Sequence, residues 1–178
     1  MNSRAEYLYR VLNMKMLPEE GTFYSEISKS EQKNAAGEPL YSLMYGLYTD
    51  VPCSQSYFHQ LEQEEIWQFY EGDPIELHLL QTDGSYQKII LGSEPSLGQT
   101  RSAVIAPYTH QAAALQAGGK YALYACMVVP AFNYRRFHLS NASELQAKYP
   151  QAADVIRKMT AAVQANSVPD LKLPGNKL

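Results

Sequence analysis

The chain has 178 residues, of which 46% are hydrophobic and 19% charged, and its formal net charge is −3. This length suits one domain with a sizeable core, and the composition excludes wholesale disorder. A slightly acidic chain without a long basic run argues against nucleic acid as a main partner.

Nothing in the chain points to a membrane or to an oxidising compartment. No apolar run approaches the ~20 residues that a membrane-spanning helix needs, and the polar residues 1–10 do not resemble a signal peptide. The two cysteines, Cys53 and Cys126, are too few for a disulfide framework or a cysteine metal site, so we expect both to be reduced. We therefore expect a cytoplasmic protein.

The first part of the chain predicts a helix followed by strands. Residues 3–14 carry an apolar stripe with helical spacing, and Ser3 and Glu6 have the spacing of a capping box. After a polar loop, residues 39–49 are apolar on both faces, as in a strand that is buried on both sides or enters a dimer interface.

Between these two elements, residues 22–27 alternate as a strand. Side chains two apart share a face of a strand, so Phe23 and Glu26 fall on opposite faces.

The central part of the chain predicts two strands, over 56–61 and 65–70, with a candidate pocket on one face. His59 shares a face with Leu61 in the first strand, and Glu65 shares a face with two aromatic residues in the second. If these strands line one concave wall, an imidazole and a carboxylate come from adjacent parts of it. The side chains of this predicted pocket are His59, Glu65, Trp67 and Phe69.

A hairpin follows. Residues 72–74 form a turn signal, residues 75–80 alternate as a strand, and an Asp-Gly turn over 82–85 leads to a partner strand over 86–91.

The last strands surround a segment whose register stays open. Residues 102–106 predict a short strand, and either His110 or Gln111 points inward after it, because a slip of one residue exchanges the two faces. Residues 121–129 form a nearly continuous apolar strand, and residues 130–139 close the sheet.

The remaining residues predict two helices over 143–165, with Ser143 and Gln146 as the first cap, and a disordered tail over 166–178. Eight or more short strands with helices only at the ends suggest an antiparallel sandwich or barrel. We expect one domain over 1–165, with a barrel core at about 18–140.

The stretch around His59 resembles the first conserved motif of the cupin superfamily. That motif has two His two residues apart, then a Glu and, after six intervening residues, a Gly. His59, Glu65 and Gly72 match it, and Leu61 stands at the second His position. The wider string is similar to an uncharacterised branch of the cupins, a domain of unknown function, over roughly residues 12–150.

This resemblance implies a fold, an assembly and further site residues. The fold is a mainly-β antiparallel double-sheet jelly roll with short N-terminal and C-terminal helices, similar to that of the deoxysugar epimerases. The assembly is a homodimer in which the N-terminal strand and helix pack across subunits. In this branch an aromatic and an acid approach the barrel mouth, and Phe23 and Glu26 match them in spacing. The second cupin motif delivers one more side chain, here His110 or Gln111.

The resemblance leaves a metal site incomplete. Metal-bearing cupins use three His and one Glu. Of this set His59 and Glu65 are in place, Leu61 stands at one position, and His110 or Gln111 stands at the last, which gives two or three ligands. Such a site would hold a divalent metal weakly, whereas a metal-free alternative pairs His59 with Glu65 by hydrogen bonding.

Two functions follow as hypotheses for a small polar ligand in the barrel. The first is a metal-independent isomerase or epimerase in which His59 and Glu65 carry acid–base chemistry. The second is a non-catalytic ligand-binding or sensing cupin whose pocket wall includes Trp67 and Phe69. A weak divalent-metal cupin and a structural dimer with a vestigial pocket remain further alternatives, and a fold alone does not decide among them.

Overall fold

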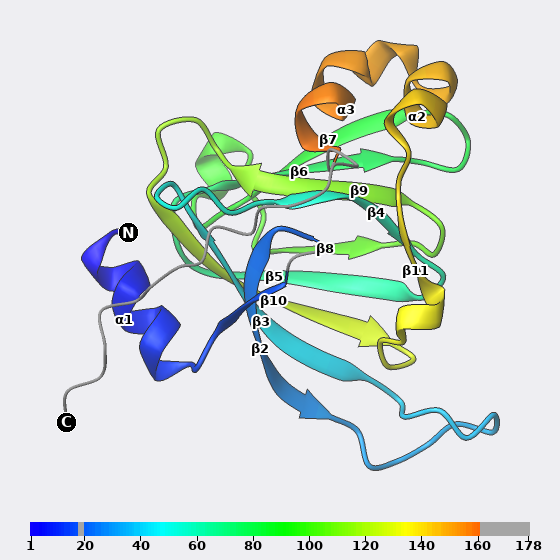
Figure 1. Ribbon diagram of the computed structural model, residues 1–178, viewed down its shortest axis with the longest axis horizontal. Coiled ribbons are helices and arrows are strands. Elements are labelled where there is room, and N and C mark those ends of the chain that lie inside the picture. The colour runs from blue at the N-terminus through cyan, green and yellow to red at the C-terminus, as the bar shows by residue number, and fades with distance from the viewer. Residues whose placement is uncertain (18–19, 161–178) are drawn as a thin grey trace.

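Alternation of apolar and polar side chains dominates the chain, and it produces two antiparallel β-sheets packed face to face (Figure 1). The computed structural model describes residues 1–17 and 20–160. The strands in this part of the chain are β1 (Lys15–Leu17), β2 (Thr22–Lys29), β3 (Ser42–Thr49), β4 (Ser56–Leu61), β5 (Glu64–Gly72), β6 (Ile75–Leu80), β7 (Tyr86–Leu91), β8 (Ser102–Ile105), β9 (His110–Leu115), β10 (Tyr121–Val129) and β11 (Phe137–Leu139).

Strands far apart in sequence are neighbours in both sheets. Within the described ranges, one sheet has the order β1-β2-β3-β10-β5-β8, and the other has the order β11-β4-β9-β6-β7. This confirms the predicted mainly-β double-sheet jelly roll with short helices near its ends.

Short helices cover the outer faces of the sheets. α1 (Ser3–Val11) lies against the six-stranded sheet, and α2 (Ala142–Lys148) and α3 (Ala153–Met159) lie on the five-stranded sheet (Figure 1). The residues buried in these two contacts are Leu8, Met14, Phe23, Leu47 and Leu123 at α1, and Phe58, Leu80, Ala112, Leu145, Tyr149, Ala152, Ile156 and Met159 at α2 and α3.

Both predicted helix caps are wrong by one or two residues. The cap of α1 is Asn2, whose Oδ1 accepts from the Arg4 N–H at 2.8 Å. The cap of α2 is Asn141, whose Oδ1 accepts from the N–H groups of Ser143 and Glu144. An Asn caps a helix as well as a Ser does, and in both cases it precedes the expected residue.

The ends of two predicted helices also differ from the structure. α1 ends at Val11 rather than at residue 14, because Asn13 takes a left-handed conformation with φ 50° that turns the chain toward β1. α3 ends at Met159, and the predicted continuation over 161–165 and the predicted tail over 166–178 lie outside the described residues.

Between the sheets, one half of the interior is filled by large side chains. Trp67 stacks on Tyr124 with ring centroids 4.7 Å apart, and the hydroxyl of Tyr124 lies 3.0 Å from that of Thr22. Gly46 leaves room for the Tyr124 ring, since a Cβ on Gly46 would lie 2.1 Å from the ring's Cζ. This packing holds β3, β5 and β10 in place.

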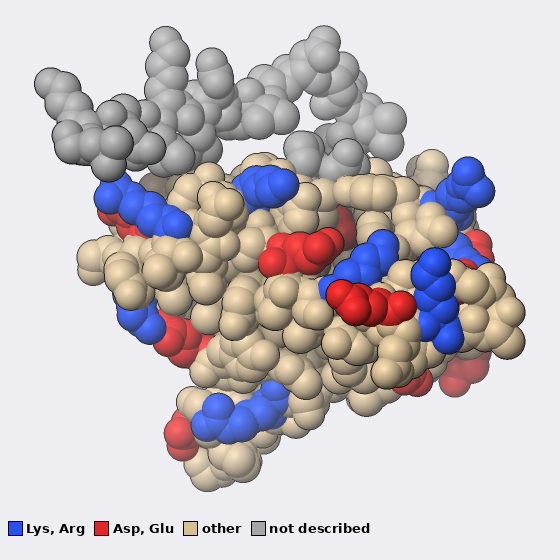
Figure 2. All heavy atoms as spheres, turned by 90° about the horizontal axis from the view of Figure 1, so that it is seen from below, with Lys and Arg blue, Asp and Glu red and all other residues tan. Residues whose placement is uncertain are grey.

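The surface carries mixed charge. Figure 2 shows one face on which Lys and Arg are interspersed with Asp and Glu. Cys53 is exposed and Cys126 is buried, and neither forms a disulfide. In the described ranges, no helix combines the length and the apolar character needed to cross a membrane.

Candidate functional site

The barrel interior is open at its other end, where a cavity of about 740 Å³ reaches between the sheets. Both polar and apolar side chains form its wall. The polar residues include Glu20, Tyr24, Glu26, His59, Glu65 and Cys126, and the apolar residues include Leu17, Leu43, Met44, Leu61, Val128 and Phe132. A cavity of this size and character suits a small polar ligand.

A β-bulge in β4 delivers His59 to this cavity. Ser56 pairs with Ala113 of β9 and His59 pairs with Gln111, so β4 has one residue more than β9 between these pairs. Strict alternation would place Ser56 and His59 on opposite faces, whereas the bulge turns both inward. Ser56 then contacts Tyr48, with 2.5 Å between the hydroxyl oxygens, and His59 lines the cavity.

The His59 ring is held in one orientation and one tautomer. His59 is 2% exposed, and its Nδ1 lies 2.8 Å from the carbonyl oxygen of Tyr57. A carbonyl only accepts, so Nδ1 carries the proton and Nε2 of the neutral ring is the acceptor. Phe137 stacks on the imidazole with centroids 5.4 Å apart. The cavity therefore contains a positioned base at Nε2.

A chain of hydrogen bonds orients Glu65. The Trp67 indole N–H donates to Gln111 Oε1 at 3.0 Å, and Gln111 Nε2 donates to Glu65 Oε2 at 2.5 Å. An indole can only donate, so Trp67 decides which way the Gln111 amide faces. Oε2 of Glu65 is thereby fixed as an acceptor, and a proton on this carboxyl belongs on Oε1.

Burial favours the neutral forms of both groups. Burial raises the pKa of Glu65, and the nearby Glu20 raises it further, while His59, Gln111 and Cys126 oppose the shift. Burial lowers the pKa of His59, and the Glu65 carboxylate opposes that shift. A neutral base beside a protonated carboxyl is the pairing that proton transfer needs.

Two neighbours of this pair were missed by sequence reasoning. Cys126 hydrogen-bonds to Glu65, and burial raises the pKa of its thiol, so the thiol remains protonated. Its alternation with Tyr124 along β10 gave an available signal for an inward position. Glu20 is 8% exposed and lines the cavity, and no periodic pattern marks it.

The other predicted site residues divide between the cavity wall and the packed interior. Glu26 lines the cavity, whereas Phe23 lies on the opposite face of β2 against α1. Trp67 lies behind Gln111, and Phe69 belongs to the packed interior.

The open register of β9 has a clear outcome in the structure. Gln111 points inward to Glu65, and His110 points outward, with its Nδ1 2.8 Å from the Ser140 hydroxyl. The structure therefore does not bring Phe23, Phe69 or His110 to the cavity wall.

The donors at the site do not fit a transition-metal centre. Such a centre needs three or four protein ligands, and the described residues contain no group of three or more His, Cys, Asp or Glu placed to hold a metal ion. Leu61 supplies no donor atom, and both ends of the Gln111 amide already bind Trp67 and Glu65.

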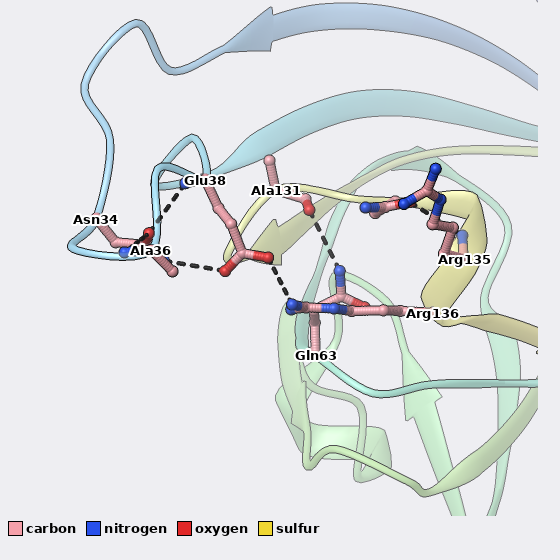
Figure 3. Close-up of polar contacts among 8 residues, drawn as sticks. Asn34, Ala36, Glu38, Gln63, Ala131, Arg135 and Arg136 are labelled. Carbon is pink, nitrogen blue, oxygen red and sulfur yellow. Dashed lines mark hydrogen bonds and ion pairs between the residues drawn. The ribbon is translucent and has the colours of Figure 1, made fainter.

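Two segments that lie near each other, over 33–39 and 131–136 (Figure 3), supply residues 37–39 and 131–135 of the cavity wall, and we call this part of the wall the mouth. Arg136 pairs with Glu38 at 2.5 Å, and the Ala131 N–H donates to the Pro39 carbonyl at 3.0 Å. The side chain of Gln63 supports the second segment by donating to the Ala131 carbonyl at 3.2 Å.

Comparison with known proteins identifies similar sequences and folds. A family model described as "Cupin superfamily (DUF985)" matches residues 6–140. A hypothetical protein from Leishmania major is 28% identical, with coverage of 88% of this chain and 98% of its own, and a TM-score of 0.79. A protein from Shewanella oneidensis is 26% identical, with coverage of 90% and 98%, and a TM-score of 0.79.

More distant similarity extends to the fold alone. A cupin 2 domain-containing protein from Halorhodospira halophila is 11% identical, with coverage of 83% of this chain and 86% of its own, and a TM-score of 0.52. A search of curated proteins found no match.

Proposed function

The chain belongs to the cupin superfamily, in the DUF985 family, and from this premise we propose that it binds a small polar molecule in the barrel and transfers a proton on it without a metal. The reaction class is isomerisation or epimerisation. The observation that carries the proposal is the contact of His59 Nδ1 with the Tyr57 carbonyl, which leaves Nε2 of the neutral ring as the acceptor on a residue that lines the same cavity as Glu65.

The chemistry uses the two groups as a base and an acid. His59 Nε2 takes a proton from a carbon next to a carbonyl group, and the electrons of that C–H bond form the double bond of an enol. Glu65 Oε1 gives its proton to the carbonyl oxygen. In an epimerisation, a proton from water reaches the same carbon on its opposite face, the enol oxygen gives its proton back to Glu65, and His59 releases to water the proton that it took. In an isomerisation that carbon bears a hydroxyl: His59 gives its proton to the former carbonyl carbon, the hydroxyl gives its proton to Glu65 and becomes the new carbonyl, and neither reaction involves net oxidation.

Solvent hydrogen exchange tests this step without a known product. A panel of keto sugars, sugar nucleotides and small keto acids is incubated with the protein in D₂O, and NMR follows deuterium incorporation next to the carbonyl. We expect incorporation into at least one compound and a loss of about 10²–10⁴-fold in His59→Asn, the usual contribution of a general base. His138→Asn is the matched control, because His138 is exposed and pairs with Glu62 outside the cavity.

Either of two results would contradict the proposal. Exchange in none of the compounds, or equal exchange in wild type and His59→Asn, would remove His59 as a base. Circular dichroism and thermal unfolding of both variants check that the fold is retained.

A second candidate function is ligand binding without chemistry, and the aromatic rings at the mouth favour it. Phe132 and Tyr134 pack edge to face with centroids 5.0 Å apart, and both line the cavity. This function predicts saturable binding with no deuterium incorporation, weakened more by Phe132→Ala than by His59→Asn.

We also propose that the chain acts as a homodimer. An apolar row crosses the outer face of the six-stranded sheet, where the register places side by side Val104, Ile66 and Met127. Val104 is 62% exposed, and such a row is suited to contact with a second copy. Sedimentation velocity of wild type and Val104→Glu tests this, with a monomer expected for the variant.

A further inference from the structure

We propose that the mouth of the cavity binds an anionic group of the ligand, a phosphate or a carboxylate, between Lys29 and Arg135. The inference rests on the proposed function in one respect, since it places the anion on the molecule whose other end reaches His59 and Glu65. It assigns two site residues that the sequence patterns do not reveal.

A β-bulge aims Lys29 into the cavity. Glu26 pairs with Met44 of β3 and Ser28 pairs with Leu43, so β2 has one residue more than β3 between these pairs. Strict alternation would place Lys29 on the outer face with Phe23, whereas the bulge moves it to the inner face with Glu26. Lys29 accordingly lines the cavity. Bulges near active sites commonly re-aim a side chain in this way.

Arg135 comes to the same rim from the far end of the chain. Lys29 pairs in register with Ser42, and the Ser42 hydroxyl accepts from the Phe132 N–H at 2.9 Å. Arg135 follows three residues later in the 3₁₀ turn η2 (Tyr134–Arg136) and also lines the cavity. Two cations from opposite parts of the sequence thus line one cavity.

The charges at the rim leave these two cations available. Arg136 is neutralised by Glu38, and Figure 3 shows the Arg135 side chain pointing away from that pair. Neither Lys29 nor Arg135 forms an ion pair with any residue that the structure describes. Among the described residues, the cavity wall also contains the acids Glu20, Glu26 and Glu65, and Glu26, which is exposed, opposes anion binding.

The chemistry of the two side chains suits a shared anion. A guanidinium binds two oxygens of a phosphate or carboxylate at once, and an ammonium adds a point charge. An anion held here leaves the rest of the cavity, which runs inward to His59 and Glu65, for the reacting part of the ligand.

Titration with inorganic phosphate and, separately, with acetate tests the site by calorimetry at low ionic strength. We expect Lys29→Gln and Arg135→Gln each to raise the dissociation constant about tenfold, the loss of one charge-assisted hydrogen bond. Glu26→Gln should lower it, because a like charge is removed. Arg101→Gln is the matched control, since Arg101 is exposed and lies outside the cavity wall.

The outcomes separate this inference from the proposed function. Binding of phosphate alone supports a phosphorylated ligand, and binding of both probes supports either anion. Absence of binding to both, or equal weakening in Arg101→Gln, overturns the anion site. Phosphate binding that persists in His59→Asn supports the site, whatever the deuterium exchange shows, so failure of the acid–base proposal is detected separately.

Discussion

At the packed end of the barrel interior, Trp67 stacks on Tyr124, whereas at the open end Glu65 hydrogen-bonds to Cys126. These two pairs lie on the same strands, β5 and β10, and are only two residues apart along each. One end is filled by aromatic rings, and the other is a cavity with ionisable groups in its wall.

The difference between the two ends shows how the free-energy cost of burying Glu65 and His59 is reduced. Glu65 and His59 are almost completely buried, which is costly unless their hydrogen bonds are fixed. At the packed end, the indole N–H of Trp67 fixes the orientation of the Gln111 amide, and this amide donates to Glu65. The rigid aromatic end therefore serves as a support for the polar open end.

The largest effect should come from removing an aromatic ring at the packed end. We expect Trp67→Ala to lower the free energy of unfolding by about 3–5 kcal/mol, because it leaves a cavity in a closed core. Phe132→Ala at the open end should cost clearly less, since that ring is partly exposed and lines an existing cavity. Urea unfolding measures both, and equal losses would contradict the comparison.

A smaller substitution removes the hydrogen bond between Trp67 and Gln111, which links the packed end to the open end. Trp67→Phe keeps most of the ring but leaves Gln111 Oε1 buried without its donor, which should cost about 1–3 kcal/mol. Adding Gln111→Leu should cost less than the sum of the two single losses, with a coupling of at least about 0.5 kcal/mol. Strict additivity in this double-mutant cycle would mean that the indole does not set the amide.

The two ends also differ in what the sequence could predict. Over residues 65–69 of β5 and 124–128 of β10, alternation correctly separates Trp67 and Tyr124 from the outward side chains, because the register shift between these strands lies outside both stretches, between Leu123 and Tyr124. The open end depends on bulges in β2 and β4, and a bulge has no periodic signature. Alternation therefore could not bring Lys29 to the cavity.

The register of β9 was open for a related physical reason. β9 begins directly after a turn in which Tyr108 adopts φ 65°. Only the partners of the two side chains, Ser140 outside and Glu65 inside, show which one faces inward. Motif spacing alone contains no information about those partners.

The ionisable pair at the open end should make stability depend on pH. Because the pKa of Glu65 is raised from 4.5 in the folded state, the folded protein binds the extra proton above that value. The contribution of the protonated Glu65 carboxyl to the free energy of unfolding is fully present below pH 4.5. It is lost as the pH rises through the pKa that this carboxyl has in the folded state. Glu65→Gln, which cannot ionise, should therefore gain stability relative to wild type as the pH rises.

Chemical unfolding of both proteins from roughly pH 5 to pH 8 measures this difference. We expect a smaller effect than that of losing the indole donor, since His59 and Gln111 offset part of the burial cost. Glu62→Gln is the control, because Glu62 lies near the surface and pairs with His138. A difference between wild type and Glu65→Gln that falls with pH would refute the direction of the shift.

The smallest expected effect concerns the turn that feeds β9 into the open end. Tyr108 holds a left-handed φ of 65°, with its N–H donating to the Leu61 carbonyl at 2.7 Å and its carbonyl accepting from Gln60 at 2.6 Å. Its side chain is 51% exposed, so little packing is lost when it is removed. Tyr108→Gly should raise the free energy of unfolding by about 0.5–1 kcal/mol, because Gly adopts this conformation without strain.

Tyr108→Ala is the matched control for that substitution. It removes the same ring but keeps the Cβ that makes a positive φ unfavourable, so it should not gain this stability. If the Gly and Ala variants are equally stable, the turn is not strained, and the orientation of Gln111 toward Glu65 must come from the contacts of β9 alone. The open end would then depend on its own hydrogen bonds rather than on a costly turn at its border.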